Sequence, residues 1–232
     1  MYLPISLALC IVSTIIFIII KTKIGGKKGV IAKAFASLMF VVGGVLAFLN
    51  KQLPFYAYFF LGALIFSFIG DILLGLFETK SGKTNSSYLL LGIAAFSITQ
   101  ILNIVGMSFH ALNEMDNIIV PLGLAAGIGI VIALLITVNS KSMGITFGKF
   151  TLPATIYSCF VISTFIYAVF LTFLVQFTWS LIIATTLFLA SDLILSFMYF
   201  GDRNQTEMDV ANKVTYYLAQ IMYVVYLFEF IF

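Results

Sequence analysis

Residues 55–77 read FYAYFFLGALIFSFIGDILLGLF, a run in which Asp71 is the only charged side chain. The run has the length that an α-helix needs to cross a bilayer, roughly 17–25 mostly apolar residues. A strand of a membrane barrel would instead be a shorter segment in which apolar and polar residues alternate. We therefore predict a membrane-spanning helix that carries a carboxyl group.

The rest of the chain has a similar composition. Of its 232 residues, 62% are hydrophobic and 9% are charged, against roughly 45–50% and about 25% in ordinary soluble domains. This composition excludes a soluble enzyme, a disordered chain and a repeat solenoid. Because backbone polar groups in lipid must be paired within their own segment, we predict an all-α bundle that forms one domain, residues 1–232. Its predicted spans are residues 2–20, 29–49, 55–77, 87–107, 118–138, 152–174, 178–200 and 213–232.

Basic residues are divided unequally between the two sides of this bundle. The first, third, fifth and seventh connections hold Lys21, Lys23, Lys27, Lys28, Lys80, Lys83, Lys141, Lys149, Arg203 and Lys213. The opposite side holds only Lys51. Since cytoplasmic loops of membrane proteins are enriched in Lys and Arg, we expect the odd-numbered connections in the cytoplasm and both termini outside.

The remaining composition argues against several classes of partner. The net charge is +3 and the basic residues are scattered over loops, which does not favour nucleic-acid binding. A zinc site of the usual kind needs several His or Cys ligands, whereas the chain has one histidine and two well-separated cysteines. We therefore expect no metal, no cofactor and no nucleic-acid partner. Seven further residues are interpreted as having no role in chemistry. His110, Glu78, Glu114 and Glu229 are interpreted as solvated, and Gly123, Gly127 and Gly129 as a helix-packing face.

An internal repeat is visible around two aspartates. Asp71 follows Ser67-Phe-Ile-Gly70, and Asp192 follows Leu189-Ala-Ser191. A glutamine lies 29 residues after the first aspartate and 28 after the second, at Gln100 and Gln220, and an aromatic residue precedes each by four positions, Phe96 and Tyr216. Because the offset is four helices, the halves would be parallel and related by an axis along the membrane normal. We predict a four-plus-four duplication, with chance resemblance between apolar runs as the alternative.

The two aspartates are the strongest candidates for chemistry. A carboxylate inside a membrane helix costs about 2.5–3.5 kcal/mol on insertion scales, so such residues are rare and usually functional. At 1.5 Å per residue, both would lie roughly 9–12 Å below the cytoplasmic surface. We predict Asp71 and Asp192 as catalytic residues. Polar residues expected near the same depth are the candidate substrate-binding groups: Lys33, Ser67, Gln100, Tyr157, Ser191, Tyr217 and Gln220. The alternative is that these groups only hold the helices together and that Lys33 extends to the interface.

Two buried carboxyl groups suit acid–base catalysis. Burial favours the protonated form of one, while a partner in a more polar setting stays ionised. The same division is used on acetal-like bonds, where a positive oxocarbenium ion develops. A site that opens to the bilayer also favours a lipid substrate.

The motifs around these residues resemble those of the lysoplasmalogenase-like (YhhN) family of membrane proteins. The resemblance extends from Lys33 to Tyr226. The matching positions are Ser67, Gly70 and Asp71; Gly92, Ala95 and Phe96; Leu152, Pro153 and Tyr157; Ser191 and Asp192; and Tyr216, Tyr217 and Gln220. The resemblance implies a multi-pass protein of the bacterial cytoplasmic membrane that hydrolyses the vinyl ether bond of a lysophospholipid to a fatty aldehyde and a glycerophospho-headgroup.

By analogy, one aspartate would protonate the vinyl ether and the other would stabilise the cation and guide water, and their roles stay open. Lys33 would meet the lipid phosphate. The chain has Gln100 where the family usually has His, Asn103 where it has Tyr, and Ala34 where many relatives have Pro. Glutamine cannot transfer a proton as histidine does, so this chain could be slower, changed in substrate or inactive as a hydrolase. The alternatives are a proton- or cation-coupled transporter or lipid-handling protein, and a structural bundle.

Overall fold

The structure is a computed structural model that describes residues 2–50, 52–79, 86–175, 179–201 and 205–230. Within these ranges it is entirely helical, with eight long α-helices. The α-helices are α1 (Tyr2–Lys23), α2 (Gly26–Asn50), α3 (Ala57–Thr79), α4 (Ser86–Ala111), α5 (Ile119–Asn139), α6 (Thr151–Val175), α7 (Trp179–Phe200) and α8 (Thr206–Glu229). A single 3₁₀ turn, η2 (Gly148–Phe150), precedes α6.

Every predicted span is a helix, so the eight-helix prediction is confirmed, and the largest boundary difference is in α8. It begins at Thr206 rather than at residue 213, because its first turn places Glu207 and Asp209 where acidic side chains interact favourably with the helix dipole. The α4 helix extends to Ala111, so His110 lies in its last turn and not in a loop.

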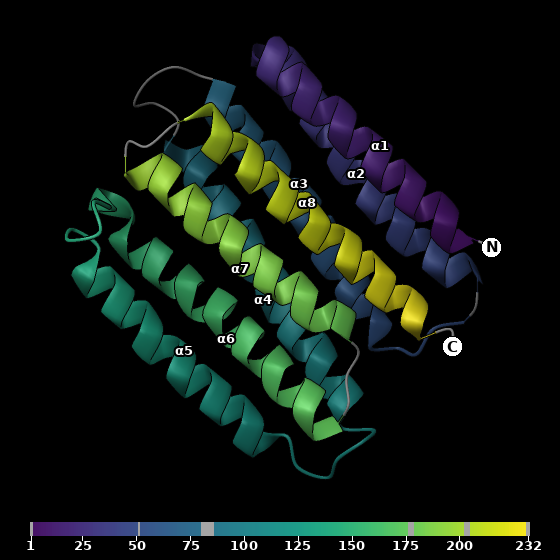
Figure 1. The fold of residues 1–232 in the computed structure, drawn as a ribbon. Helices are drawn as coiled ribbons and strands as arrows, with labels where there is room; N and C mark the ends of the chain where they lie inside the picture. Colours follow the sequence, from purple (N-terminus) through teal and green to yellow (C-terminus); the bar gives the residue numbers. More distant parts are fainter. Residues whose placement is uncertain (1, 51, 80–85, 176–178, 202–204, 231–232) are drawn as a thin grey trace.

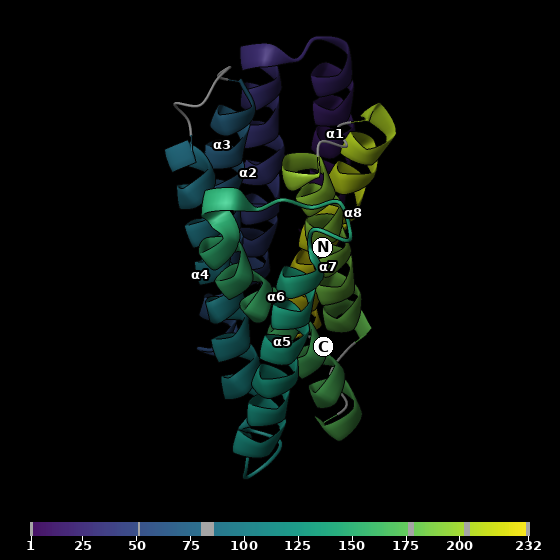
Figure 2. The same ribbon diagram turned by 90° about the vertical axis from the view of Figure 1, so that its left-hand side faces the viewer.

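The helices form antiparallel hairpins that pack into one bundle (Figure 1). Neighbours in sequence pair as α1 with α2, α3 with α4, α5 with α6, and α7 with α8. The pair α1 and α2 lies at one edge and α5 lies at the opposite edge (Figures 1 and 2). The last helix, α8, packs on α1, α2 and α3 as well as on α7, and α4 packs on α6, so these contacts join the two halves of the chain.

The exposed surface of the bundle is apolar. Among the described residues, seven helices, α1 to α7, are long and apolar enough to cross a membrane. Exposed side chains of the edge helix α5 include Ile119, Val120, Leu124 and Val131, an arrangement that water would not tolerate over so large an area. The chain is therefore an integral membrane protein. The more polar α8 is largely buried by its neighbours, as expected for a membrane helix whose polar residues face the bundle interior.

Equivalent residues of the predicted repeat meet at the centre of the bundle. The rings of Phe96 in α4 and Tyr216 in α8 lie 6.0 Å apart and perpendicular to one another. Ser37 in α2 donates to Asp71 in α3 at 2.6 Å, and Tyr157 in α6 donates to Asp192 in α7, also at 2.6 Å. Offsets of 120 or 121 residues relate all of these pairs, in agreement with the predicted duplication.

The glycines of α5 differ in their surroundings. A Cβ atom on Gly129 would lie 2.9 Å from the backbone nitrogen of Ser163 in α6, whereas Gly123 and Gly127 have open space around them. Of the three glycines predicted to form a packing face, only Gly129 packs against a neighbouring helix.

This contrast predicts different effects of two conservative substitutions. Gly129→Ala should lower the stability of the purified protein by about 1–3 kcal/mol, because α6 backbone must move to admit the methyl group. Gly127→Ala adds the same methyl group in open space and should leave stability unchanged or slightly raised. Thermal unfolding of both variants in detergent measures the difference, and equal melting temperatures would contradict the close approach.

Candidate functional site

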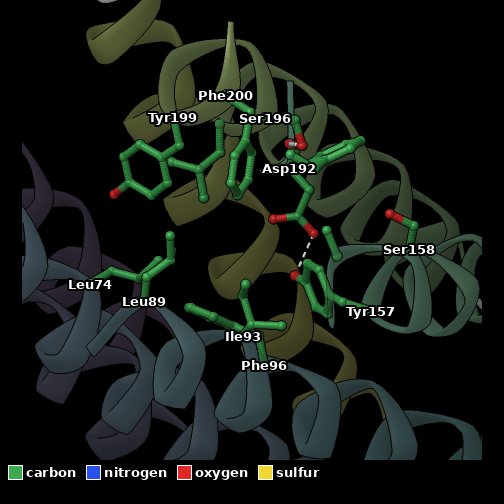
Figure 3. A pocket seen from close by; sticks show the side chains of 13 residues that line it. Leu74, Leu89, Ile93, Phe96, Tyr157, Ser158, Asp192, Ser196, Tyr199 and Phe200 are labelled. Carbon is green, nitrogen blue, oxygen red and sulfur yellow. Dashed lines mark hydrogen bonds between the residues drawn. The ribbon is translucent and has the colours of Figure 1, made fainter. Parts of the chain in front are cut away.

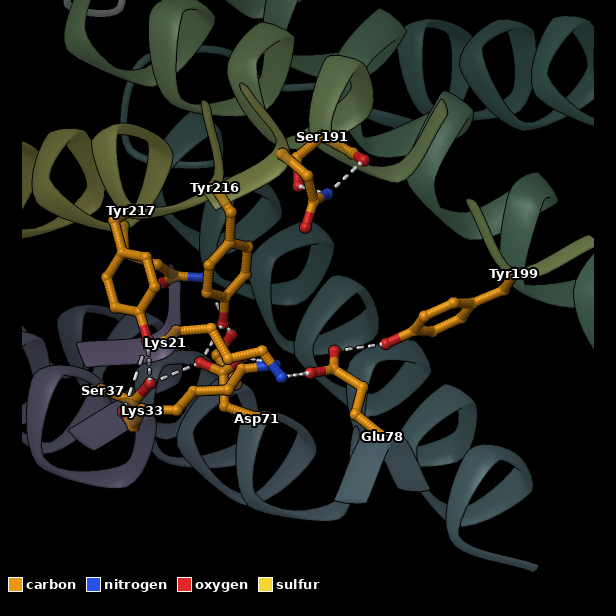
Figure 4. A network of polar contacts seen from close by, with 12 residues as sticks. Lys21, Lys33, Ser37, Asp71, Glu78, Ser191, Tyr199, Tyr216 and Tyr217 are labelled. Carbon is orange, nitrogen blue, oxygen red and sulfur yellow. Dashed lines mark hydrogen bonds and ion pairs between the residues drawn. The ribbon is translucent and has the colours of Figure 1, made fainter. Parts of the chain in front are cut away.

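Asp71 lies at the centre of a buried polar cluster built from α2, α3 and α8 (Figure 4). Its Oδ1 is 3.4 Å from Lys33 Nζ. Its Oδ2 accepts hydrogen bonds from Ser37 at 2.6 Å and from Tyr216 at 2.7 Å. Only 3% of the Asp71 side chain is exposed, so a cation and two hydroxyl groups replace the water that an ionised carboxyl group would otherwise need.

Tyr217 contacts the α2 side of this cluster. Its hydroxyl group is 2.8 Å from Ser37 Oγ and donates to the Lys33 carbonyl oxygen at 3.3 Å. It therefore positions the α2 residues that contact Asp71. Ser37 lies one helical turn after Lys33 and so on the same face of α2, a spacing that could have identified it from the sequence.

Asp192 has a different environment on α7 (Figure 3). The Tyr157 hydroxyl donates to its Oδ2 at 2.6 Å. In the described part of the chain, no Lys, Arg or His forms an ion pair with it. Asp192 is also less buried than Asp71. Each aspartate of the repeat thus accepts a hydrogen bond from a hydroxyl group, but only Asp71 has a cation beside it.

A polar pocket brings both aspartates to one space, with a free volume of about 30 Å³. That volume accommodates about two water molecules. Its lining consists of Phe17, Lys33, Asp71, Leu74, Glu78, Phe96, Ser191, Asp192, Leu195, Asp209, Asn212, Lys213, Tyr216 and Tyr217. In this pocket the structure brings together carboxyl groups, cations and a space large enough for water.

An inner apolar pocket adjoins the polar pocket and shares Leu74, Phe96, Asp192 and Leu195 with it. The other residues that line it are mainly apolar: Leu89, Ile93, Phe147, Ala154, Tyr157, Ser158, Ser196, Tyr199 and Phe200. Asp192 therefore stands where a polar space meets an apolar one.

The structure divides the predicted substrate-binding residues into groups. Lys33, Ser191 and Tyr217 line the polar pocket, and Tyr157 lines the inner apolar pocket. Ser191 accepts hydrogen bonds from Asn212 Nδ2 at its carbonyl oxygen, 2.8 Å, and at Oγ, 3.0 Å. These contacts hold the start of α8 against α7.

Ser67, Gln100 and Gln220 lie in a separate buried layer between α3, α4 and α8. Gln220 Nε2 donates to Ser67 Oγ at 3.2 Å, and Ser67 Oγ is 3.3 Å from Thr99 Oγ1. Gln100 is equally buried, but within the described ranges its Nε2 has no hydrogen-bond partner, and neither does the Asn103 amide. Two of the three positions at which the sequence differs from the motifs it resembles thus carry unpaired amide groups.

Three residues interpreted as solvated have specific side-chain partners. Glu78 accepts hydrogen bonds from Lys21 at 2.5 Å and from Tyr199 at 2.7 Å, and so joins α1, α3 and α7 beside the polar pocket (Figure 4). His110 Nδ1 is 2.7 Å from the Tyr226 hydroxyl, and Glu229 accepts from Ser180 at 2.5 Å. Glu78 is exposed as well as bonded, whereas the interpretation was wrong for the partly buried His110 and Glu229. Helix ends in this bundle pack against neighbouring helices, which a single sequence does not reveal.

Gln100 and Gln220 form a matched pair for testing the buried layer. Gln220→Met should lower stability by about 1 kcal/mol, because Ser67 loses its amide partner. Gln100→Met removes an amide nitrogen that has no partner, and should be neutral or stabilising. Thermal unfolding compares the two, and a larger loss for Gln100→Met would contradict the arrangement.

Comparison with known proteins agrees with this geometry. The sequence profile of the YhhN family matches residues 29–226, a range that includes both aspartates and all of the predicted substrate-binding residues. No curated protein and no solved structure matches the chain. With the motif residues assembled around one pair of aspartates and the match covering most of its length, the chain belongs to the YhhN family.

Proposed function

We propose that the chain is a membrane-embedded hydrolase that cleaves the vinyl ether bond of a lysoplasmalogen or a related single-chain ether lipid. The observation that carries the proposal is that Asp71 and Asp192 border one buried pocket with different partners. Hydrolysis of this bond needs a proton donor and an anion, and two carboxyl groups in unlike environments supply both.

The partners of each aspartate support an assignment of roles. Asp71 pairs with Lys33 and accepts two hydroxyl hydrogen bonds, which favours its ionised form. Asp192 has one hydroxyl donor, on Oδ2, and borders an apolar pocket, which suits a neutral carboxyl group. We assign Asp192 as the acid and Asp71 as the anion.

The reaction then proceeds in two stages that consume one water molecule. Asp192 gives its proton to the second carbon of the alkenyl chain, and the positive charge develops on the first carbon and the ether oxygen. Asp71 stabilises this cation and takes a proton from a water molecule that attacks the first carbon. The hemiacetal collapses when its hydroxyl proton returns to Asp192 and Asp71 protonates the departing glycerol oxygen. Both carboxyl groups regain their starting states, and the products are a fatty aldehyde and the glycerophospho-headgroup.

The pockets support a matching placement of the substrate. The polar pocket, with Lys33 and Lys213, suits the phosphate end, and the inner apolar pocket suits the chain. Lys33 is also paired with Asp71 and Lys213 with Asp209, so a phosphate would join existing ion pairs. The free volume of the inner apolar pocket is about 50 Å³, and a bound chain must displace its flexible lining side chains.

Removal of either carboxyl group tests the proposal. Asp71→Asn and Asp192→Asn should each lower aldehyde release from an alkenyl lysophospholipid by at least about a hundredfold, the usual contribution of a positioned acid or base. The control Asp116→Asn changes an exposed residue of the α4–α5 connection and should keep full activity. In D₂O, the aldehyde should carry one deuterium on the carbon next to the carbonyl group. Full activity in both site variants, with folding intact, would exclude the proposal, and proton-coupled uptake into proteoliposomes that either variant abolishes would favour a transporter.

The role of Asp71 as the ionised partner is tested through Lys33. Lys33→Met should lower the rate, because an unpaired buried carboxylate becomes protonated and no longer stabilises a cation. The kcat of the double variant Lys33→Met/Asp71→Asn should be no lower than that of Asp71→Asn alone, since each change removes the negative charge at position 71. Loss of the phosphate contact of Lys33 should appear in KM instead. Steady-state rates of the three variants measure the coupling, and effects that multiply would show that Lys33 acts independently of Asp71.

A further inference from the structure

A third cavity, the outer apolar pocket, lies between α5, α6 and α7. Its free volume of about 50 Å³ equals that of the inner apolar pocket. Its lining residues are Ile136, Met143, Ile145, Phe147, Tyr157, Ser158, Val161, Ile162, Leu189, Asp192, Leu193, Ser196 and Phe197. Asp192 is the only charged residue among them, so the chemistry of the cavity fits a hydrocarbon chain.

The two apolar pockets differ in their access to the outside of the bundle. In the outer pocket, Leu193 is 41% exposed and Met143 is 36% exposed. In the inner pocket, Leu74 and Leu89 are 4% exposed and Phe96 is 6% exposed. The outer pocket therefore reaches the exposed apolar surface of α7 at Leu193, whereas the residues that line the inner pocket are all buried or only partly exposed.

The pockets meet along the seam between α6 and α7. They share Tyr157, Ser158 and Asp192, together with Phe147 and Ser196. The hydrogen bond from Tyr157 to Asp192 crosses this seam (Figure 3). A chain that passes from one pocket to the other must therefore pass the proposed acid.

The corresponding seam of the first half is closed. At Gly75, the repeat equivalent of Ser196, a Cβ atom would lie 3.3 Å from Val30 and 3.7 Å from the Lys33 side chain. Lys33 and Ser37 both reach across from α2 to Asp71. The seam in the second half has a single hydroxyl contact to its aspartate and a cavity on each side.

We infer that the outer apolar pocket is a lateral opening through which the chain of a single-chain lipid passes from the bilayer, between α6 and α7, into the inner apolar pocket. The inference rests on the proposed function for its substrate. It adds the route, and it makes the Tyr157–Asp192 hydrogen bond the contact that must open during access. The headgroup end reaches the polar pocket and stays on the side of Lys33 and Lys213.

Two tryptophan substitutions at the mouth test the route, each with a matched control. Leu193→Trp fills the mouth from α7, and Ile72→Trp places the same ring at the equivalent repeat position in α3, which lines none of these pockets. Ile136→Trp fills the mouth from α5, and Ile132→Trp lies one turn away on the lipid-facing surface. The mouth variants should lower kcat/KM for a long-chain alkenyl lysolipid by about tenfold. They should spare a short-chain, water-soluble substrate, and the controls should keep both activities. Equal losses on both substrates, or no loss on either, would overturn the inference.

A second measurement needs no turnover and so separates this inference from the proposed hydrolysis. The protein in nanodiscs is irradiated with a single-chain glycerophospholipid whose chain carries a diazirine, and labelled residues are mapped by mass spectrometry. Label should appear on the inner pocket residues Leu89 and Ile93, and Leu193→Trp should reduce it severalfold while Ile72→Trp leaves it unchanged. Undiminished inner-pocket labelling in Leu193→Trp would overturn the lateral opening even if aldehyde release is observed. If Leu193→Trp loses inner-pocket labelling and neither the unmodified protein nor any variant releases aldehyde, the lateral opening would be supported and the hydrolase rejected.

Discussion

A carboxylate within a bilayer is stable only when protein groups replace the water it has lost, and the centre of this bundle is organised by that constraint. Asp71 obtains its replacement from Lys33, Ser37 and Tyr216, which come from two other helices. These contacts require α2, α3 and α8 to approach closely, and Tyr217 holds the α2 side in place. The same groups that make the charge tolerable therefore determine how three helices pack.

The second aspartate of the repeat, Asp192, has fewer partners than Asp71, and its surroundings differ accordingly. Position 153, the equivalent of Lys33, is a proline, so α6 supplies only the Tyr157 hydroxyl to Asp192. With fewer contacts across the α6–α7 seam, cavities remain on both sides of it. Two halves with related sequences thus produce one aspartate that is held in a closed, charge-paired cluster and one that is left beside apolar space. The proposed division between anion and acid follows from this asymmetry.

Two of the positions that differ from the motifs this sequence resembles lie one layer away from the aspartates. In the described part of the chain, Gln100 and Asn103 carry buried amide groups without partners, whereas the repeat-related Gln220 is bonded to Ser67. Buried polar groups in native proteins are usually paired with protein or with ordered water. The unpaired amide groups of this layer are therefore chemically unusual, and they lie at positions where the sequence also differs from the motifs it resembles. The effect of this layer on the site would act through α4, which carries Phe96 between the two pockets.

The membrane location, the helices and the two intramembrane aspartates could be read from the amino-acid sequence, because long apolar runs and rare intramembrane charges depend only on local composition. The sequence also determined the repeat, since the spacing of Asp71, Gln100, Asp192 and Gln220 is visible without coordinates. Which polar residues share a pocket depends on the packing of the helices. This packing placed Lys33 on Asp71, separated Ser67 and Gln220 from the aspartates, and brought Glu78 to Lys21 and Tyr199. These contacts join residues far apart in the chain, and they depend on how helices rotate and approach one another, which helical periodicity within a single segment does not specify.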